Sequence, residues 1–121
     1  MADENRVAGI LYIDLDGTQL DVIGDFTINI NGKKRETLSG SNKRHGYKEM
    51  IKEVFIEGEI RDSQNLDMEA IYNVTNSTIR AQLANGKDIV LRNAFYAGDG
   101  DLGTEEANLQ VRFEGMSGEV V

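Results

Sequence analysis

Apolar and polar residues alternate along most of this chain with a period of two, which is typical of β-strands that bury one face. The clearest example is Thr78–Tyr96, in which two alternating runs are joined by Asn85-Gly86. Asn tolerates a positive φ and Gly has no Cβ, so this dipeptide favours a type I′ turn. The segment predicts a β-hairpin, and its apolar face needs other strands to cover it. That face consists of Ile79, Ala81, Leu83, Ile89, Leu91 and Phe95.

Further alternating runs supply those strands. They are Val7–Leu15, Thr18–Val22, Phe26–Ile30, Ile51–Arg61 and Asn108–Glu114. Asp16-Gly17 predicts a second hairpin turn between the first two runs. A short helix is expected at Leu66–Asn73, with Asn65 or Asp67 as its N-cap. The pattern therefore predicts a mainly β fold, an antiparallel β-sandwich or barrel with one short flanking α-helix, in a single domain that spans residues 1–121.

The segment Lys33–Lys48, KKRETLSGSNKRHGYK, breaks the alternation and has one Leu and one Tyr as its only large apolar residues. It is too polar to bury itself and longer than most connections between strands, which indicates a functional loop or one that a partner orders. A solvated loop is the alternative. Because the whole protein is acidic, we expect this long basic loop to contact another copy of the chain. Its candidate contact residues are Lys33, Lys34, Arg35, Lys43, Arg44, Tyr47 and Lys48.

Charge limits the classes of partner and chemistry. A net charge of −8 and a pI near 4.6 argue against tight nucleic-acid binding, which depends on Lys and Arg. The absence of cysteine and the single histidine, His45, leave no thiolate site and no histidine-based triad or metal centre. The longest apolar-rich run, Val7–Ile13, is too short to cross a bilayer. We therefore expect no catalytic residue, no metal, no cofactor and no membrane partner.

One short motif indicates an enzyme instead. LYIDLDGT places Asp14 and Asp16 after an apolar run and resembles the nucleophile motif of haloacid-dehalogenase-like phosphatases. That chemistry needs a parallel sheet with crossover helices, whereas this chain predicts hairpins and one short helix. The predicted fold therefore argues against a phosphatase, which is one alternative function. The other alternative is a monomeric β-sandwich binding module.

Read from end to end, the chain resembles the tail tube protein of Mu-like contractile-tailed phages. The matching pieces are NRVAG with Tyr12, KRETLSG with GYKE, FIEGE, TIRAQLANGK, and VRFEG with the GE near the end, in this order over nearly the whole length. The resemblance implies a structural protein whose six copies close into a ring, and rings that stack into a hollow tube. The inner tube of type VI secretion is similar in fold.

The resemblance also implies partners and a place. The tube would conduct DNA into the host without binding it specifically, hold the tape-measure protein, and be wrapped by the tail sheath protein. The protein would belong to the virion and assemble in the cytoplasm of the bacterial host. In the run Ile51–Arg61, strand period separates apolar Val54, Ile56 and Ile60 from an acidic face. We expect the acids of that face to line the channel, with an acidic outer surface as the alternative. They are Glu53, Glu57 and Glu59.

Overall fold

The computed structural model describes residues 9–40 and 44–121. This part of the chain contains eleven β-strands and one short helix. In chain order they are β1 (Ile10–Leu15), β2 (Thr18–Leu20), β3 (Val22–Asn29), β4 (Lys33–Ser39), β5 (Arg44–Ile51), β6 (Val54–Arg61), α1 (Met68–Tyr72), β7 (Ser77–Leu83), β8 (Asp88–Tyr96), β9 (Leu102–Gly103), β10 (Asn108–Gly115) and β11 (Ser117–Val120).

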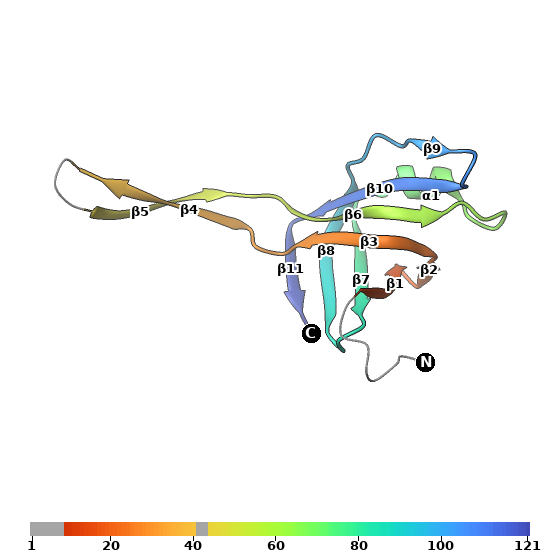
Figure 1. Cartoon of the computed structure of the whole chain (residues 1–121), viewed down its shortest axis with the longest axis horizontal. Coiled ribbons are helices and arrows are strands. Elements are labelled where there is room, and N and C mark those ends of the chain that lie inside the picture. Colours follow the sequence, from red (N-terminus) through yellow and green to blue (C-terminus); the bar gives the residue numbers. More distant parts are fainter. Residues whose placement is uncertain (1–8, 41–43) are drawn as a thin grey trace.

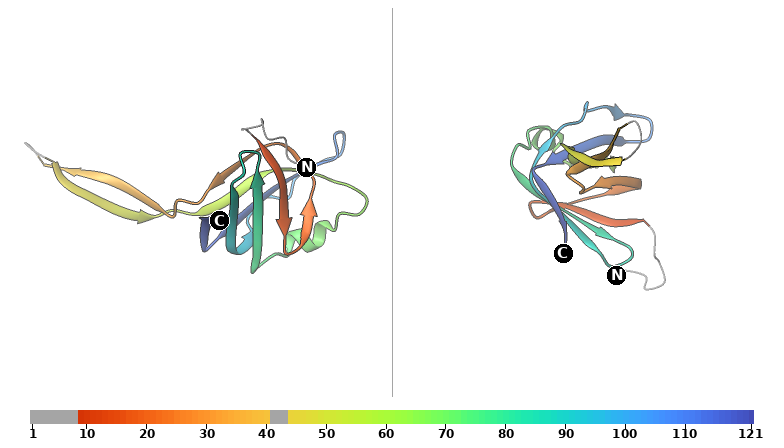
Figure 2. Two further views of the ribbon diagram at one scale, coloured as in Figure 1. Left: turned by 90° about the horizontal axis from the view of Figure 1, so that it is seen from below. Right: turned by 90° about the vertical axis from the view of Figure 1, so that its left-hand side faces the viewer.

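Nine of the strands form one sheet, with the order β2-β1-β7-β8-β10-β6-β3 along its main path. In addition, β11 pairs with β8 and β9 pairs with β10, and the strand pairs of the described residues are antiparallel. The sheet curves until β3 approaches β1, so the body is nearly a closed barrel (Figure 1). Figure 2 shows β11, β8, β7 and β1 side by side in its left view. The predicted fold class is confirmed.

The predicted central hairpin is present as β7 and β8, but its turn differs from the prediction. Gly86 has a φ of 93°, whereas Asn85 does not have the positive φ that a type I′ turn requires. The turn spans Leu83 to Gly86, whose N–H donates to the Leu83 carbonyl at 3.1 Å. The Asn85 side-chain oxygen accepts from the N–H of Lys87 at 3.1 Å. The link between β7 and β8 is therefore longer than the two-residue turn that we predicted, and Asn85 contributes a side-chain acceptor to it. At the β1–β2 turn, both residues have the expected positive φ, 49° at Asp16 and 92° at Gly17.

The second strand of this hairpin changes its alternation halfway. Ile89 and Leu91 are buried as predicted, but Phe95 is 37% exposed and Ala94 is fully buried in its place. The cause is Asn93, which has a φ of 53° at the point where the β7–β8 register shifts. One extra residue in a strand turns the following side chains to the opposite face. The assignment of Phe95 to the buried face was therefore wrong.

Helix α1 begins where the sequence predicts a cap. The Asp67 carboxylate accepts from the N–H of Ala70 at 3.1 Å, which makes Asp67 the N-cap. Ile71 is buried, and the Tyr72 ring meets Tyr96 edge-on at 5.3 Å between centroids. The helix is short because it has only this narrow apolar side to bury. It lies at one end of the curved sheet, beside the β1–β2 hairpin (Figure 2, left view).

The basic segment is a hairpin and not the irregular loop that we predicted. Strands β4 and β5 form a separate two-stranded sheet in which Lys33 pairs with Ile51 and Thr37 with Tyr47. Figure 1 shows this pair projecting from the body in line with β3 and β6. Pairing satisfies the backbone N–H and C=O groups that face the partner strand, and water can bind those on the two outer edges. So polar a sequence can therefore be regular without a core. We call β4 and β5 together the arm.

The core fills the interior of the curved sheet and comes almost entirely from the alternating runs. Val54, Ile56 and Ile60 of β6 point inward, as predicted from their period. The largest fully buried side chains are Ile13, Ile56, Ile60, Ile79, Leu91, Leu109 and Phe113.

Candidate functional site: a basic arm and an acidic sheet face

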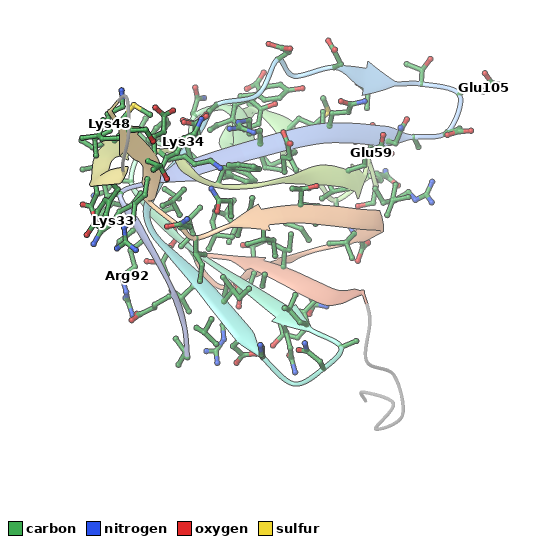
Figure 3. All side chains as sticks on the ribbon, turned by 60° about the vertical axis from the view of Figure 1, so that its left-hand side comes forward. Lys33, Lys34, Lys48, Glu59, Arg92 and Glu105 are labelled. Carbon is green, nitrogen blue, oxygen red and sulfur yellow. The ribbon has the colours of Figure 1, made fainter. Side chains whose placement is uncertain are left out.

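Polar side chains of β6 and β10 form one outer face of the body, which we call the acidic face (Figure 3). Because the inward residues of β6 are apolar, strand period places Glu57 and Glu59 outward, and Glu53 directly precedes the strand. The register pairs Arg112 with Glu57 and Glu114 with Phe55. The acidic residues that we predicted to share one side of the strand therefore do so.

Arg112 lies in the middle of these carboxylates. It donates to Glu114 at 3.0 Å and to Glu57 at 2.9 Å, and it approaches Glu53 at 3.8 Å. Burial acts to lower the pKa of Arg112, but its hydrogen bonds to Glu114 and Glu57 outweigh burial and raise the pKa. The guanidinium therefore stays charged and offsets part of the negative charge. The face is acidic overall, but a positively charged arginine lies among its carboxylates.

Two further contacts order this face. The guanidinium carbon of Arg112 lies 4.0 Å from the centre of the Phe55 ring, a cation–π arrangement that accounts for an aromatic residue among acids. The Glu59 carboxylate accepts from Asn108 at 3.0 Å and from Gln110 at 3.5 Å. Our sequence analysis did not single out Arg112. The signal was available, because the alternation of β10 places it on the side opposite Leu109, Val111 and Phe113.

The arm presents charge and apolar surface on both of its faces. One face carries Arg35, which bonds Glu49 at 3.0 Å and lies 5.3 Å from the centre of the Tyr47 ring. On the other face, Glu36 pairs with Lys34 at 3.7 Å and with Lys48 at 3.4 Å. The arm also exposes apolar side chains, and Tyr47 is 59% exposed and Ile51 98%. Nothing in the described body covers these residues.

The structure brings six of the seven predicted contact residues together on the arm. Their positions alternate along the two strands, so each face of the arm carries some of them. The seventh, Lys43, lies outside the described residues. The six are Lys33, Lys34, Arg35, Arg44, Tyr47 and Lys48.

The phosphatase-like motif is a hairpin turn. The Asp14 carboxylate accepts from the N–H of Gly17 at 2.7 Å, and the Asp16 carboxylate accepts from the N–H of Thr78 at 2.9 Å. Hydrogen bonds from the Ser77 side chain and the Thr78 backbone lower the pKa of Asp16. The Asp14 carboxylate therefore closes the β1–β2 turn, and the Asp16 carboxylate holds this turn against β7. The antiparallel pairing of the described strands does not provide the parallel sheet that phosphatase chemistry needs.

Two other kinds of site are absent from the part of the chain that the structure describes. The described residues contain no group of three or more His, Asp or Glu side chains placed to hold a metal ion. Nor do they include a helix with the length and apolar character needed to span a bilayer. The arm and the acidic face therefore remain the candidate functional surfaces.

Comparison with known proteins identifies the family of the chain. The family model described as phage tail tube protein matches residues 4–120. The chain is also 28% identical over 97 residues to the Mu-like prophage FluMu tail tube protein of Haemophilus influenzae strain Rd, which covers 80% of this chain and 81% of that protein. Since the family model spans nearly the whole sequence, the chain belongs to the phage tail tube protein family and is a structural component of a phage tail.

Proposed function

We propose that six copies of this chain close into a ring and that the rings stack into the hollow inner tube of a contractile tail, which conducts DNA into the host. The family supports the structural role in a tail. The observation that carries the assembly is the arm, a two-stranded sheet without a covering layer on the described body. An isolated pair of strands is marginally stable in water, so a second copy would supply the packing that it needs.

Open strand edges support the same proposal. β11 pairs with β8 on one side, and β2 ends the main path of the sheet. Such edges are a hazard in a monomer, because their unpaired N–H and C=O groups can recruit any other strand. In a closed ring, each edge would instead be covered by the neighbouring copy. A monomeric binding module has no comparable use for both the open edges and the arm.

The acidic face suits the wall of a channel for DNA. Glu53, Glu57 and Glu59 share one side of the sheet, and Arg112 offsets only part of their charge. Lys and Arg on such a wall would bind phosphates by counterion release and retard the DNA, whereas carboxylates repel it. DNA would then pass without specific binding. We further propose that the tube holds the tape-measure protein, is wrapped by the tail sheath protein and assembles in the host cytoplasm.

Deleting the arm tests the assembly. Lys33 and Ile51 are paired neighbours, so replacing residues 34–50 with an Asn-Gly turn closes the gap without stretching the body. We expect the intact protein to form rings or tubes in electron micrographs. The armless variant should remain folded, with a β-type circular dichroism spectrum and cooperative thermal unfolding, but unassembled. Native mass measurement provides the second readout. A monomer at all concentrations for the intact protein would favour the binding module.

A further inference from the structure

Charge is strongly separated along the long axis of this molecule. Figure 3 shows Lys33, Lys34 and Lys48 at the arm end, and Glu59 and Glu105 toward the opposite end. By sequence, residues 33–51 hold six of the 13 Lys and Arg residues but two of the 21 Asp and Glu residues. The arm is therefore net positive on a protein of charge −8. Two copies would attract each other most strongly when opposite ends meet.

The end opposite the arm is hollowed. A groove of about 390 Å³ lies between β9, β10 and the ends of β3 and β6, and we call it the end groove. Its charged lining has three carboxylates and one guanidinium, and Ile23 gives it one apolar wall. The lining residues are Ile23, Glu59, Arg61, Glu105, Glu106 and Asn108.

Hydrogen bonds fix the backbone around the end groove but do not involve the carboxylates of Glu105 and Glu106 among the described residues. Arg61 donates to the backbone carbonyl of Glu106 at 2.7 Å, and the N–H of Asp62 donates to the Ala107 carbonyl at 2.8 Å. The side chains of Glu105 and Glu106 are exposed, and neither belongs to an ion pair among the residues that the structure describes. The groove is thus a preformed acidic surface that is ready to accept Lys side chains.

The direction of the arm decides which arrangement brings the two surfaces together. The arm continues β3 and β6 away from the body, and the end groove lies where these two strands meet β9 and β10 at the other end (Figure 1). A copy shifted along the strand direction places its end groove at the base of the arm. A parallel side-by-side pair would instead bring arm to arm and repel. Head-to-tail contacts of this kind do not close on themselves and generate filaments.

We propose that the base of the arm, around Lys33 and Lys34, docks in the end groove of the next copy along the tube. The proposal rests on the self-assembly proposed above and adds the surface that receives the arm. Lys33 belongs to no ion pair among the described residues, so it can pair with Glu105 or Glu106 of the next copy without losing a contact. Ile51, which pairs with Lys33 across the arm, would be covered at the same junction.

The absence of cysteine from the chain allows a direct test. One preparation carries Lys33→Cys and a second carries Glu105→Cys, and the two are mixed, assembled and oxidised. We expect a disulfide-linked dimer of one copy of each variant, on non-reducing gels, in assembled material. The matched control replaces Glu105→Cys with Asn85→Cys, which lies in the exposed β7–β8 turn. We expect the control pair to give at least about fivefold less product, since only close and well-oriented Cβ atoms form a disulfide.

A charge exchange provides the second test. Glu105→Lys should raise the protein concentration needed for assembly by up to about fivefold, the effect of one exposed ion pair. Adding Lys33→Glu to the same chain should bring that concentration back, because the pair is restored with its signs reversed.

The outcomes separate this inference from the proposed function. Tubes that form normally, with no more cross-linking between positions 33 and 105 than in the control, would refute the docking site and leave the tube intact. Failure of the double charge variant to recover, when its unfolding temperature equals that of the intact protein, would also count against the site. If the intact protein forms neither rings nor tubes, the proposed function itself is wrong and the inference falls with it.

Discussion

At the scale of single residues, Arg112 has the largest influence on the acidic face. Its guanidinium contacts three carboxylates and one aromatic ring, and its side chain is 23% exposed. Ion pairs at this level of burial are screened less by water than those at the open surface. Arg112 therefore permits several Glu side chains to lie close together without strong repulsion.

Replacing it with a side chain of similar length tests this role. Arg112→Met keeps the packing against Phe55 but leaves Glu53, Glu57 and Glu114 without their common partner. We expect the free energy of unfolding at neutral pH to fall by about 1–2 kcal/mol. The deficit should shrink in acid, where the carboxylates bind protons. Urea unfolding at several pH values measures both effects.

Arg92→Met is the matched control. Arg92 pairs with Glu119 at the surface, and both side chains are about half exposed. The loss should stay within about 0.5 kcal/mol, as for other exposed pairs. An equal loss in the two variants would contradict the special role of Arg112.

At the scale of elements, the junction of β3 and β6 depends on a glycine. Gly58 lies opposite Val111 on the inner face of β6, and a Cβ at this position would lie 2.6 Å from the Phe26 ring. Phe26 belongs to the part of β3 where the register with β6 shifts, between Ile23 and Thr27. The ring thus fills the space that a side chain would otherwise occupy, and the two strands stay close across an irregular stretch.

Gly58→Ala should therefore destabilise the protein, although alanine favours a strand more than glycine does. We expect the free energy of unfolding to fall by about 1–3 kcal/mol, because the ring must move. In the double variant with Phe26→Ala, the loss should be smaller than the sum of the two single losses.

Gly32→Ala is the matched control. The added Cβ would meet the nearest atom, of Val54, at an ordinary 3.6 Å. We expect a change within about 0.5 kcal/mol. Thermal unfolding of the four variants measures these differences, and additive losses at Gly58 and Phe26 would contradict the steric account.

At the scale of the whole molecule, shape and charge run along the same axis. The arm continues the line of β3 and β6, the acidic face lies along β6 and β10, and the end groove lies at the far end of the same strands (Figure 1). A molecule with these features has two different ends, so a tube of copies that all point the same way also has two different ends. In the proposed tube, the strands that join one ring to the next also carry the acids toward the channel.

Charge reversal on the acidic face tests the channel. Glu53→Lys is the most suitable change, because the Glu53 side chain is 57% exposed and its distance to Arg112 is 3.8 Å. Glu57 and Glu59 make closer hydrogen bonds, so their replacement would disturb the fold as well. We expect tubes to form normally and DNA ejection to slow, since each ring gains cations that hold phosphates.

Glu69→Lys is the control for this experiment. Glu69 is exposed on α1 and forms no ion pair with the acidic face among the described residues, and the variant changes net charge equally. We expect it to eject DNA at the normal rate. Time-resolved fluorescence of released DNA measures the effect, and normal ejection from Glu53→Lys particles would refute the assignment of this face to the channel.

The sequence by itself determined the strands, the inward residues and the family resemblance. A period of two assigns Val54, Ile56 and Ile60 to the core with no knowledge of neighbours, because a strand can bury only alternate side chains. Asp16-Gly17 and the Asp67 cap are equally local, since their hydrogen bonds join residues a few positions apart. The order of the quoted motifs pointed to the tail tube family, which the family model confirms.

Only the tertiary structure decided the features that depend on distant residues. The exposure of Phe95 follows from a register shift against β7, and Arg112 meets Glu57 although the two residues are 55 positions apart along the chain. The sequence did not predict the strands of the arm, because alternation of apolar and polar residues indicates burial. These strands are paired but not buried. A hydrogen-bonded hairpin without a core leaves no apolar pattern in the sequence, so the three-dimensional pairing alone reveals it.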